Sequence, residues 1–102
     1  MTELLQSTDF QKQLDYIFSI HLDDDIRSID LQLVNVTELG TASQAGFRNP
    51  FSLHFLGPVS QQYLQQHTYQ MLNETLGRLD IFIVPLGLDA EAGRMRYEAI
   101  FT

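Results

Sequence analysis

The chain has no cysteine and no tryptophan, and it contains no long hydrophobic run. The absence of cysteine excludes disulfides, thiolate metal sites and cysteine nucleophiles. No apolar stretch approaches the roughly 20 residues that a membrane-spanning helix requires, and the N-terminus lacks the basic and apolar regions of a secretory signal. We therefore expect a cytoplasmic protein that is not exported by the general secretory route.

Basic residues are also scarce. Six lysines and arginines stand against 13 aspartates and glutamates, which gives a formal net charge of −7. This charge repels the phosphate backbone of nucleic acids and anionic lipid surfaces, so we expect neither nucleic acid nor membrane among the partners. The acidity favours solubility, and it secondarily suggests a protein partner with basic groups.

The rest of the composition is that of an ordinary globular protein, with 44% hydrophobic and 19% charged residues in a length of 102. A chain of this size buries roughly two-thirds of its unfolded surface around one core. We therefore predict a single domain over residues 1–102.

The C-terminal third predicts two β-hairpins. Leu79–Gly87 and Met95–Phe101 are apolar, β-prone runs, and a turn between Gly87 and Gly93 joins them. Thr68–Leu72 precedes them and pairs with the first run around the turn Asn73–Gly77. Because proline cannot donate to a β-ladder, we expect Pro85 at a strand end or on an edge strand.

The N-terminal half predicts one helix and three further strands. A capping-box spacing between Thr8 and Gln11 predicts a short helix over residues 8–14, which would lay Phe10 and Leu14 over an open end of the sheet. Residues 15–22 alternate, with Tyr16, Phe18, Ile20 and Leu22 on the buried face.

The apolar positions of the next run change parity after Leu33, which indicates a β-bulge. Phe51–Phe55 is the remaining strand. The sequence thus predicts an all-β (or β-rich α+β) fold, a small closed or partly open antiparallel β-barrel of about six strands with one short N-terminal helix. A sandwich is the alternative arrangement of the same strands.

No residues have the spacing of a metal or nucleophile site. His21, His54 and His67 lie in different predicted strands or strand edges without a second ligand at the spacing that would preassemble a pair, so we expect them to face solvent. Barrel closure could still bring two of them together. Ser52 and His54 share a strand face but would lie about 7 Å apart, too far for a nucleophile and its base.

The carboxylates give no clear site either. Asp23–Asp25 lacks the ligand spacing of an EF-hand loop and is interpreted as a solvated turn. Glu38, Asp80 and Glu98 could form a catalytic pair only if the strands brought them together. We therefore expect no enzymatic activity, no cofactor and no metal.

Surface groups remain as candidates for contact with a partner. Glutamines around an aromatic residue, and arginines near the last hairpin, are the amphipathic and bidentate groups that interfaces use. The candidate partner-contact residues are Gln61, Gln62, Tyr63, Gln65, Arg94 and Arg96.

Five segments resemble a small bacterial family described only as a domain of unknown function (number 6916). They are Pro50–Pro58, Gln66–Tyr69, Leu76–Gly77, Phe82–Gly87 and Tyr97–Thr102. The resemblance implies a domain of similar length and supplies no catalytic residues. Taken as residues of a fold, Phe51, Phe55, Phe82 and Phe101 of these segments are interpreted as core. His67 stands where the family pattern suggests a glycine.

The family is associated with phage-tail-collar-like fibre proteins, and the resemblance therefore implies an accessory or assembly role. The main functional hypothesis is a non-enzymatic protein that binds a tail-like or fibre-type partner, with an exposed edge strand available for strand addition. The alternative is a small-ligand binding barrel with an enclosed cavity of at least ~300 Å³, whose mouth would be formed by the loops Gly40–Pro50 and 57–67. The sequence leaves open whether the protein is a monomer or a homodimer.

Overall fold

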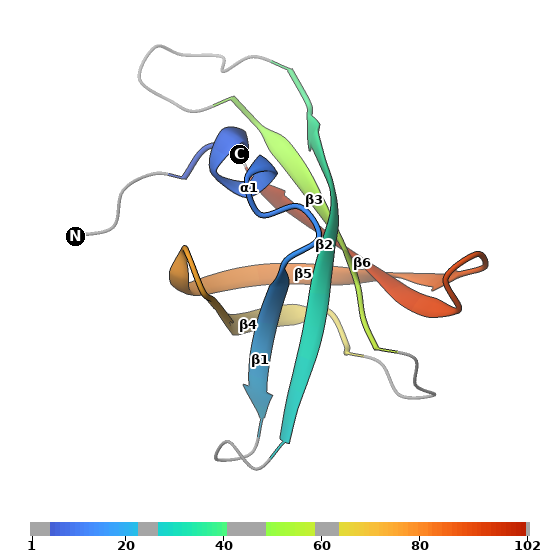
Figure 1. The fold of residues 1–102 in the computed structure, drawn as a ribbon. Coiled ribbons are helices and arrows are strands. Elements are labelled where there is room, and N and C mark those ends of the chain that lie inside the picture. The colour runs from blue at the N-terminus through green and yellow to red at the C-terminus, as the bar shows by residue number, and fades with distance from the viewer. Residues whose placement is uncertain (1–4, 23–26, 41–48, 59–63, 102) are drawn as a thin grey trace.

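The computed structural model describes residues 5–22, 27–40, 49–58 and 64–101. These residues form a closed antiparallel β-barrel with the strand order β1-β2-β3-β6-β5-β4, and one short helix lies over one end of it (Figure 1). The predicted fold class is confirmed. The elements are α1 (Ser7–Gln11), β1 (Ile17–Leu22), β2 (Arg27–Glu38), β3 (Phe51–Leu56), β4 (His67–Asn73), β5 (Gly77–Asp89) and β6 (Arg94–Phe101).

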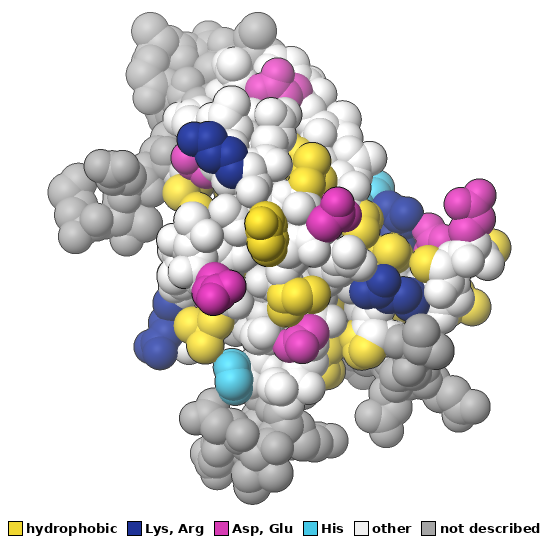
Figure 2. Space-filling model, viewed as in Figure 1, with side chains coloured by type: hydrophobic (Ala, Val, Ile, Leu, Met, Phe, Trp, Pro, Cys, Tyr) yellow, Lys and Arg dark blue, Asp and Glu magenta, His cyan; other side chains and the backbone are white. Residues whose placement is uncertain are grey.

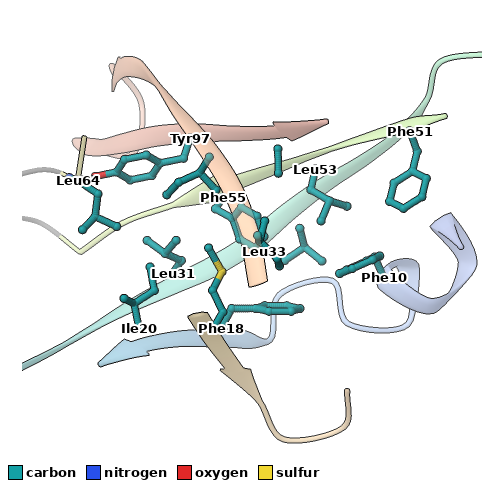
Figure 3. Packing of buried hydrophobic residues seen from close by; sticks show 14 residues of the cluster. Phe10, Phe18, Ile20, Leu31, Leu33, Phe51, Leu53, Phe55, Leu64 and Tyr97 are labelled. Carbon is teal, nitrogen blue, oxygen red and sulfur yellow. Dashed lines mark hydrogen bonds between the residues drawn. The ribbon is translucent and has the colours of Figure 1, made fainter. Parts of the chain in front are cut away.

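Alternate residues of the strands fill the barrel. Successive side chains on a strand point to opposite faces of the sheet, so every second side chain of each strand is directed into the barrel. Phe18 and Phe55 meet edge to face inside the barrel, with ring centroids 5.4 Å apart. Figure 3 shows Phe10 and Phe51 at the α1 end of this core, and Leu64 and Tyr97 at the opposite end.

The helix is shorter than predicted and is placed by a single aromatic side chain. It ends at Gln11, and its N-cap is Gln6 rather than Thr8. The capping box is formed by Gln6 and Asp9, whose carboxylate accepts the backbone N–H of Gln6 at 2.8 Å. Phe10 is fully buried, as predicted. Leu14 lies beyond the helix and is 39% exposed, so its predicted place over the barrel end was wrong.

Two bulges shape the first strands. The β2–β3 register shifts between Leu33 and Asn35, which confirms the predicted bulge. A second bulge precedes β1: Leu33 O accepts the N–H of Asp15 at 2.7 Å and Leu33 N–H donates to Tyr16 O at 3.1 Å, while Asp15 has a left-handed φ of 72°. The extra residue changes the parity of the chain, so Tyr16 is 60% exposed instead of buried as predicted.

The strand β5 is longer than predicted and changes partners along its length. Its first half pairs with β4 and its second half with β6. Pro85 lies inside this strand, opposite Tyr97, but beyond the last β4 pair, His67–Ile83. Because main-chain groups alternate along a strand and those of Val84 face β6, the Pro85 nitrogen faces the side where no described strand pairs, which fits the predicted edge position.

The turn between β5 and β6 is correspondingly short. β5 continues to Asp89 and β6 begins at Arg94, so the predicted turn region from Gly87 onward was too long. The predicted turn at Asp23–Asp25 and most of the Gly40–Pro50 loop lie outside the described residues. Within the described ranges, no helix is long and apolar enough to cross a membrane.

Candidate functional site

A chain of four polar side chains crosses the outer face of β3 and β6. His54 of β3 lies opposite Glu98 of β6 in the ladder, and His54 Nε2 is 3.0 Å from Glu98 Oε2. Arg96 Nη1 lies 3.1 Å from His54 Nδ1, and Arg96 Nη2 donates to Asp89 Oδ2 at 2.7 Å. We call Asp89, Arg96, His54 and Glu98 the polar chain.

The polar chain fixes the protonation of the imidazole. A guanidinium can only donate, so His54 Nδ1 must accept the hydrogen bond from Arg96. The ring proton then lies on Nε2 and is donated to the Glu98 carboxylate. Both ring nitrogens are therefore engaged. Sequence analysis predicted that His54 faces solvent, yet its side chain is only 25% exposed.

Asp89 holds the other end of the polar chain at the β5–β6 turn. The hydrogen bond from Arg96 lowers the pKa of Asp89 below its ordinary value of 3.8, and the backbone N–H of Ala92 adds to the effect. The Ala92 N–H donates to Asp89 Oδ1 at 2.9 Å, which closes the turn. The hydrogen bonds of the polar chain thus connect β3, β6 and the β5–β6 turn.

The predicted partner-contact residues separate into three groups. Gln61, Gln62 and Tyr63 lie outside the described residues, and Gln65 is exposed. Arg96 belongs to the polar chain. Arg94 donates to Gly57 O and Leu56 O and, at 3.0 Å, to Gln32 Oε1, so it holds the end of β3 against β2 and β6.

Glu38, Asp80 and His67 do not belong to the polar chain. Glu38 accepts a hydrogen bond from Ser7 Oγ at 2.7 Å, and Asp80 is exposed on β5. His67 of β4 stacks edge to face on Tyr69, with ring centroids 5.2 Å apart. Within the part of the chain that the structure describes, no group of three histidines or carboxylates could hold a metal ion.

The outer half of β5 offers a different kind of site, an unpaired strand edge. The ladder between β5 and β6 ends at the pair Val84–Glu98, and no described strand pairs with the earlier residues of β5 on that side. We call residues 78–82 the open β5 edge. In Figure 1 the two strands diverge at this point, β6 running toward α1 and β5 toward the turn that follows β4.

The direction of the main-chain groups follows from the ladder. Met95 O accepts the N–H of Gly57, so the main-chain N–H and C=O groups of Met95 point toward β3. Because these groups alternate in direction along a strand, those of Glu98 point toward β5. The main-chain groups of its partner Val84 therefore point toward β6. Counting back in steps of two, the N–H and C=O groups of Phe82 and Asp80 point away from β4, toward the gap.

Apolar side chains flank the open β5 edge. Phe82 is 48% exposed and Ile100, on the facing side of the gap, is 58% exposed. Sequence analysis placed Phe82 in the core, which was wrong. Strict alternation could have identified it, because Leu79, Ile81 and Ile83 share the inward parity and leave Phe82 outside.

The interior of the barrel is occupied by packed side chains, as Figure 3 shows, with Phe18, Leu33 and Phe55 among those at its centre. The small-ligand alternative therefore gains no support from this region. The functional surface is to be sought on the outside of the barrel.

Comparison with known proteins defines the family. No curated protein and no solved structure matches the chain. The family model described as a domain of unknown function, DUF6916, matches residues 5–101, which includes α1 and all six strands. The chain therefore belongs to the DUF6916 family.

Proposed function

We propose that this protein is a non-enzymatic interaction domain that binds an extended segment of a protein partner as an added strand on the open β5 edge. One observation carries the proposal: the β5–β6 ladder stops at Val84–Glu98 and leaves an edge whose main-chain groups face a gap. Strand addition uses such an edge, since main-chain hydrogen bonds give affinity and alternate side chains give specificity.

The side chains of the edge indicate the chemistry of the bound segment. Asp80 and Phe82 are exposed and point outward, while Ile81 between them is buried. A bound strand would place an apolar residue near Phe82 and a basic residue near Asp80, each cross-strand pair contributing roughly 0.2–1 kcal/mol. The net charge of −7 favours the approach of a basic partner.

The class of the partner comes from the family resemblance. We propose a fibre-type or phage-tail-like protein as the partner, in line with what the family resemblance implies, and the domain would then serve as an accessory or assembly factor. A small, rigid barrel with a short unpaired edge suits this role, because the edge is preorganised and the bound segment alone has to become ordered.

The test uses proline at an edge position. The Asp80 N–H faces the gap, so Asp80→Pro removes a donor that the described ladders do not use, and Asp80→Ala is the matched control that keeps it. The probes are the products of the genes that flank the gene of this protein, with binding measured by titration calorimetry. We expect Asp80→Pro to weaken binding about tenfold or more and Asp80→Ala about threefold or less.

Two results would contradict the proposal. If a flanking gene product binds the wild type and the Asp80→Pro variant equally, the open β5 edge is not the contact. If no flanking gene product binds at all, the assembly role is wrong. Thermal melting of both variants checks that the fold is retained.

A further inference from the structure

A surface cleft of about 430 Å³ lies between the α1–β1 connection and the turn that follows β4. It is distinct from the open β5 edge. It is lined by Gln13, Asp15 and Tyr16 of the α1–β1 connection and by Asn73 and Glu74 at the end of β4 and in the turn that follows it. The volume falls within the range of about 300–1,000 Å³ that small-molecule sites occupy.

Gln13 is the distinctive residue of the cleft. It is only 6% exposed, and its backbone is used by the turn, since its N–H donates to Phe10 O and its carbonyl accepts the N–H of Tyr16. Its side-chain amide has no hydrogen-bond partner among the described residues. No fully buried side-chain nitrogen or oxygen of the described chain lacks a partner, so this amide must reach the space of the cleft.

Gln13 thus combines a nearly buried residue with a side-chain amide that is accessible and has no hydrogen-bond partner among the described residues. A ligand with matching donors and acceptors can take the place of solvent at this amide. The Gln13 amide offers both a donor and an acceptor to whatever enters the cleft. We therefore take it as the recognition group of a ligand site.

The walls of the cleft are held in place by the backbone. The bulge at Asp15 and Tyr16 turns the tyrosine outward, and its ring is largely exposed on the cleft wall. Asn73 is fixed in position, because its Nδ2 donates to Ile17 O at 3.2 Å and its Oδ1 accepts the N–H groups of Thr75 and Leu76. The site is thus preorganised on both sides.

The charges of the cleft exclude several ligand classes. Asp15 and Glu74 outnumber Lys12, so an anionic ligand such as a phosphate is repelled. Two carboxylates are too few for a metal site, in line with the absence of a three-ligand group among the described residues. Figure 2 shows the same mixture on the face that includes β1, with hydrophobic side chains in the middle, acidic ones between them and basic ones toward its margins.

We propose that this cleft binds a neutral saccharide. Each sugar hydroxyl both donates and accepts, which matches the Gln13 amide and the carboxylates of Asp15 and Glu74. The apolar C–H face of a sugar ring would lie on the Tyr16 ring, which combines an apolar surface with a polar tip. The proposal goes beyond the proposed function, since it assigns a second activity to a different surface.

The experiment is saturation-transfer NMR and titration calorimetry on the intact chain. The probes are D-glucose, N-acetyl-D-glucosamine and maltose at millimolar concentration, with spermidine as a cationic comparison. We expect binding of at least one saccharide, weakened about tenfold in Gln13→Met and in Tyr16→Ala. Tyr16→Phe, which keeps the ring, should bind nearly as the wild type does.

Two controls show whether a loss of saccharide binding comes from loss of the fold, and whether the cleft acts independently of the open β5 edge. Gln13→Met keeps the side-chain volume and removes an amide that has no hydrogen-bond partner among the described residues, so its melting temperature should equal or exceed that of the wild type. Asp80→Pro should retain saccharide binding, because the open β5 edge is a different surface.

Four outcomes would overturn the inference. They are an absence of binding by all three saccharides, equal binding by the wild type and Gln13→Met, binding of spermidine in place of the saccharides, and a marked loss of stability in Gln13→Met. The last result would show that the amide has a structural role.

Discussion

Replacing Phe10 by alanine should destabilise the whole barrel, although this residue lies in a helix of five residues. The Phe10 side chain is fully buried, and its ring centroid is 5.3 Å from that of Phe101, 5.7 Å from Phe51 and 6.2 Å from Phe18. A helix this short has no stability of its own, so the contacts of this ring hold α1 on the barrel. Its removal opens the end of the core that the helix covers.

The expected magnitude follows from the burial. Truncating a buried phenylalanine to alanine costs about 3–5 kcal/mol, and a domain of this kind has a total stability of about 5–15 kcal/mol. Since 1 kcal/mol shifts the melting temperature of a small domain by roughly 4–8 °C, we expect a decrease of about 12 °C or more. Phe10→Leu, which refills most of the space, should cost only roughly 1–2 kcal/mol.

Urea unfolding followed by far-UV circular dichroism and tyrosine fluorescence measures this effect, as the chain has four tyrosines and no tryptophan. Leu14→Ala is the matched control, because Leu14 is partly exposed just beyond the same helix and should cost less than about 1 kcal/mol. A loss of less than about 1 kcal/mol in Phe10→Ala would refute the reasoning, since it would mean that α1 does not close the core.

Two further predictions concern polar groups. Tyr97→Phe should cost about 1–3 kcal/mol in urea unfolding, because the hydroxyl accepts the buried backbone N–H of Leu64 at 2.8 Å; an unchanged midpoint would contradict this bond. Asp89→Asn should lower the melting temperature at neutral pH. The folded-state pKa of Asp89 lies below its ordinary value of 3.8, so its stabilisation is present above that pH and is lost as the pH falls through the folded pKa. The difference in melting temperature between the wild type and Asp89→Asn should therefore shrink below about pH 4. A difference that does not change with pH would exclude the Arg96 contact as its cause.

The strands themselves could be predicted because their signals are local. Alternation of apolar and polar residues marks a half-buried strand, and glycine marks the turns, so the number of strands and a small antiparallel barrel could be predicted, while its closure was left open beside a partly open barrel and a sandwich. The bulge after Leu33 was also visible, because an inserted residue changes the parity of the apolar positions. Boundaries were less certain: β5 and β6 continue further into their turn than their apolar runs indicate.

The exposure of Tyr16 could not be predicted, because it depends on contacts between residues far apart in the sequence. Its bulge is defined by two hydrogen bonds to Leu33, and the sequence next to β1 contains nothing that marks an inserted residue. An apolar residue before a strand therefore reads as core although it faces solvent.

The polar chain was missed for a related reason. His54 and Glu98 become neighbours only through the β3–β6 register, and Arg96 reaches His54 from the pair Leu56–Arg96, two positions along the same ladder. Spacing along one strand cannot show a partner on another. The sequence left open that closure of the barrel could bring two histidines together. In the described residues, closure instead places His54 beside Arg96 and Glu98, and Arg96 beside Asp89.

Both candidate surfaces lie where the ladders are irregular. The cleft adjoins the bulge at Asp15 and Tyr16, and the open β5 edge begins where β5 changes partner, close to the register shift after Pro85. A regular strand buries every second side chain and pairs its main-chain groups with its neighbours, so it leaves few groups for a ligand to bind. An inserted residue can turn an apolar side chain toward solvent, and a change of partner strand can leave a main-chain N–H group unpaired. A ligand or partner that contacts such a group stabilises it. In a barrel whose interior is filled by its own side chains, recognition is therefore expected at these irregularities, and the two sets of variants proposed here test each of them separately.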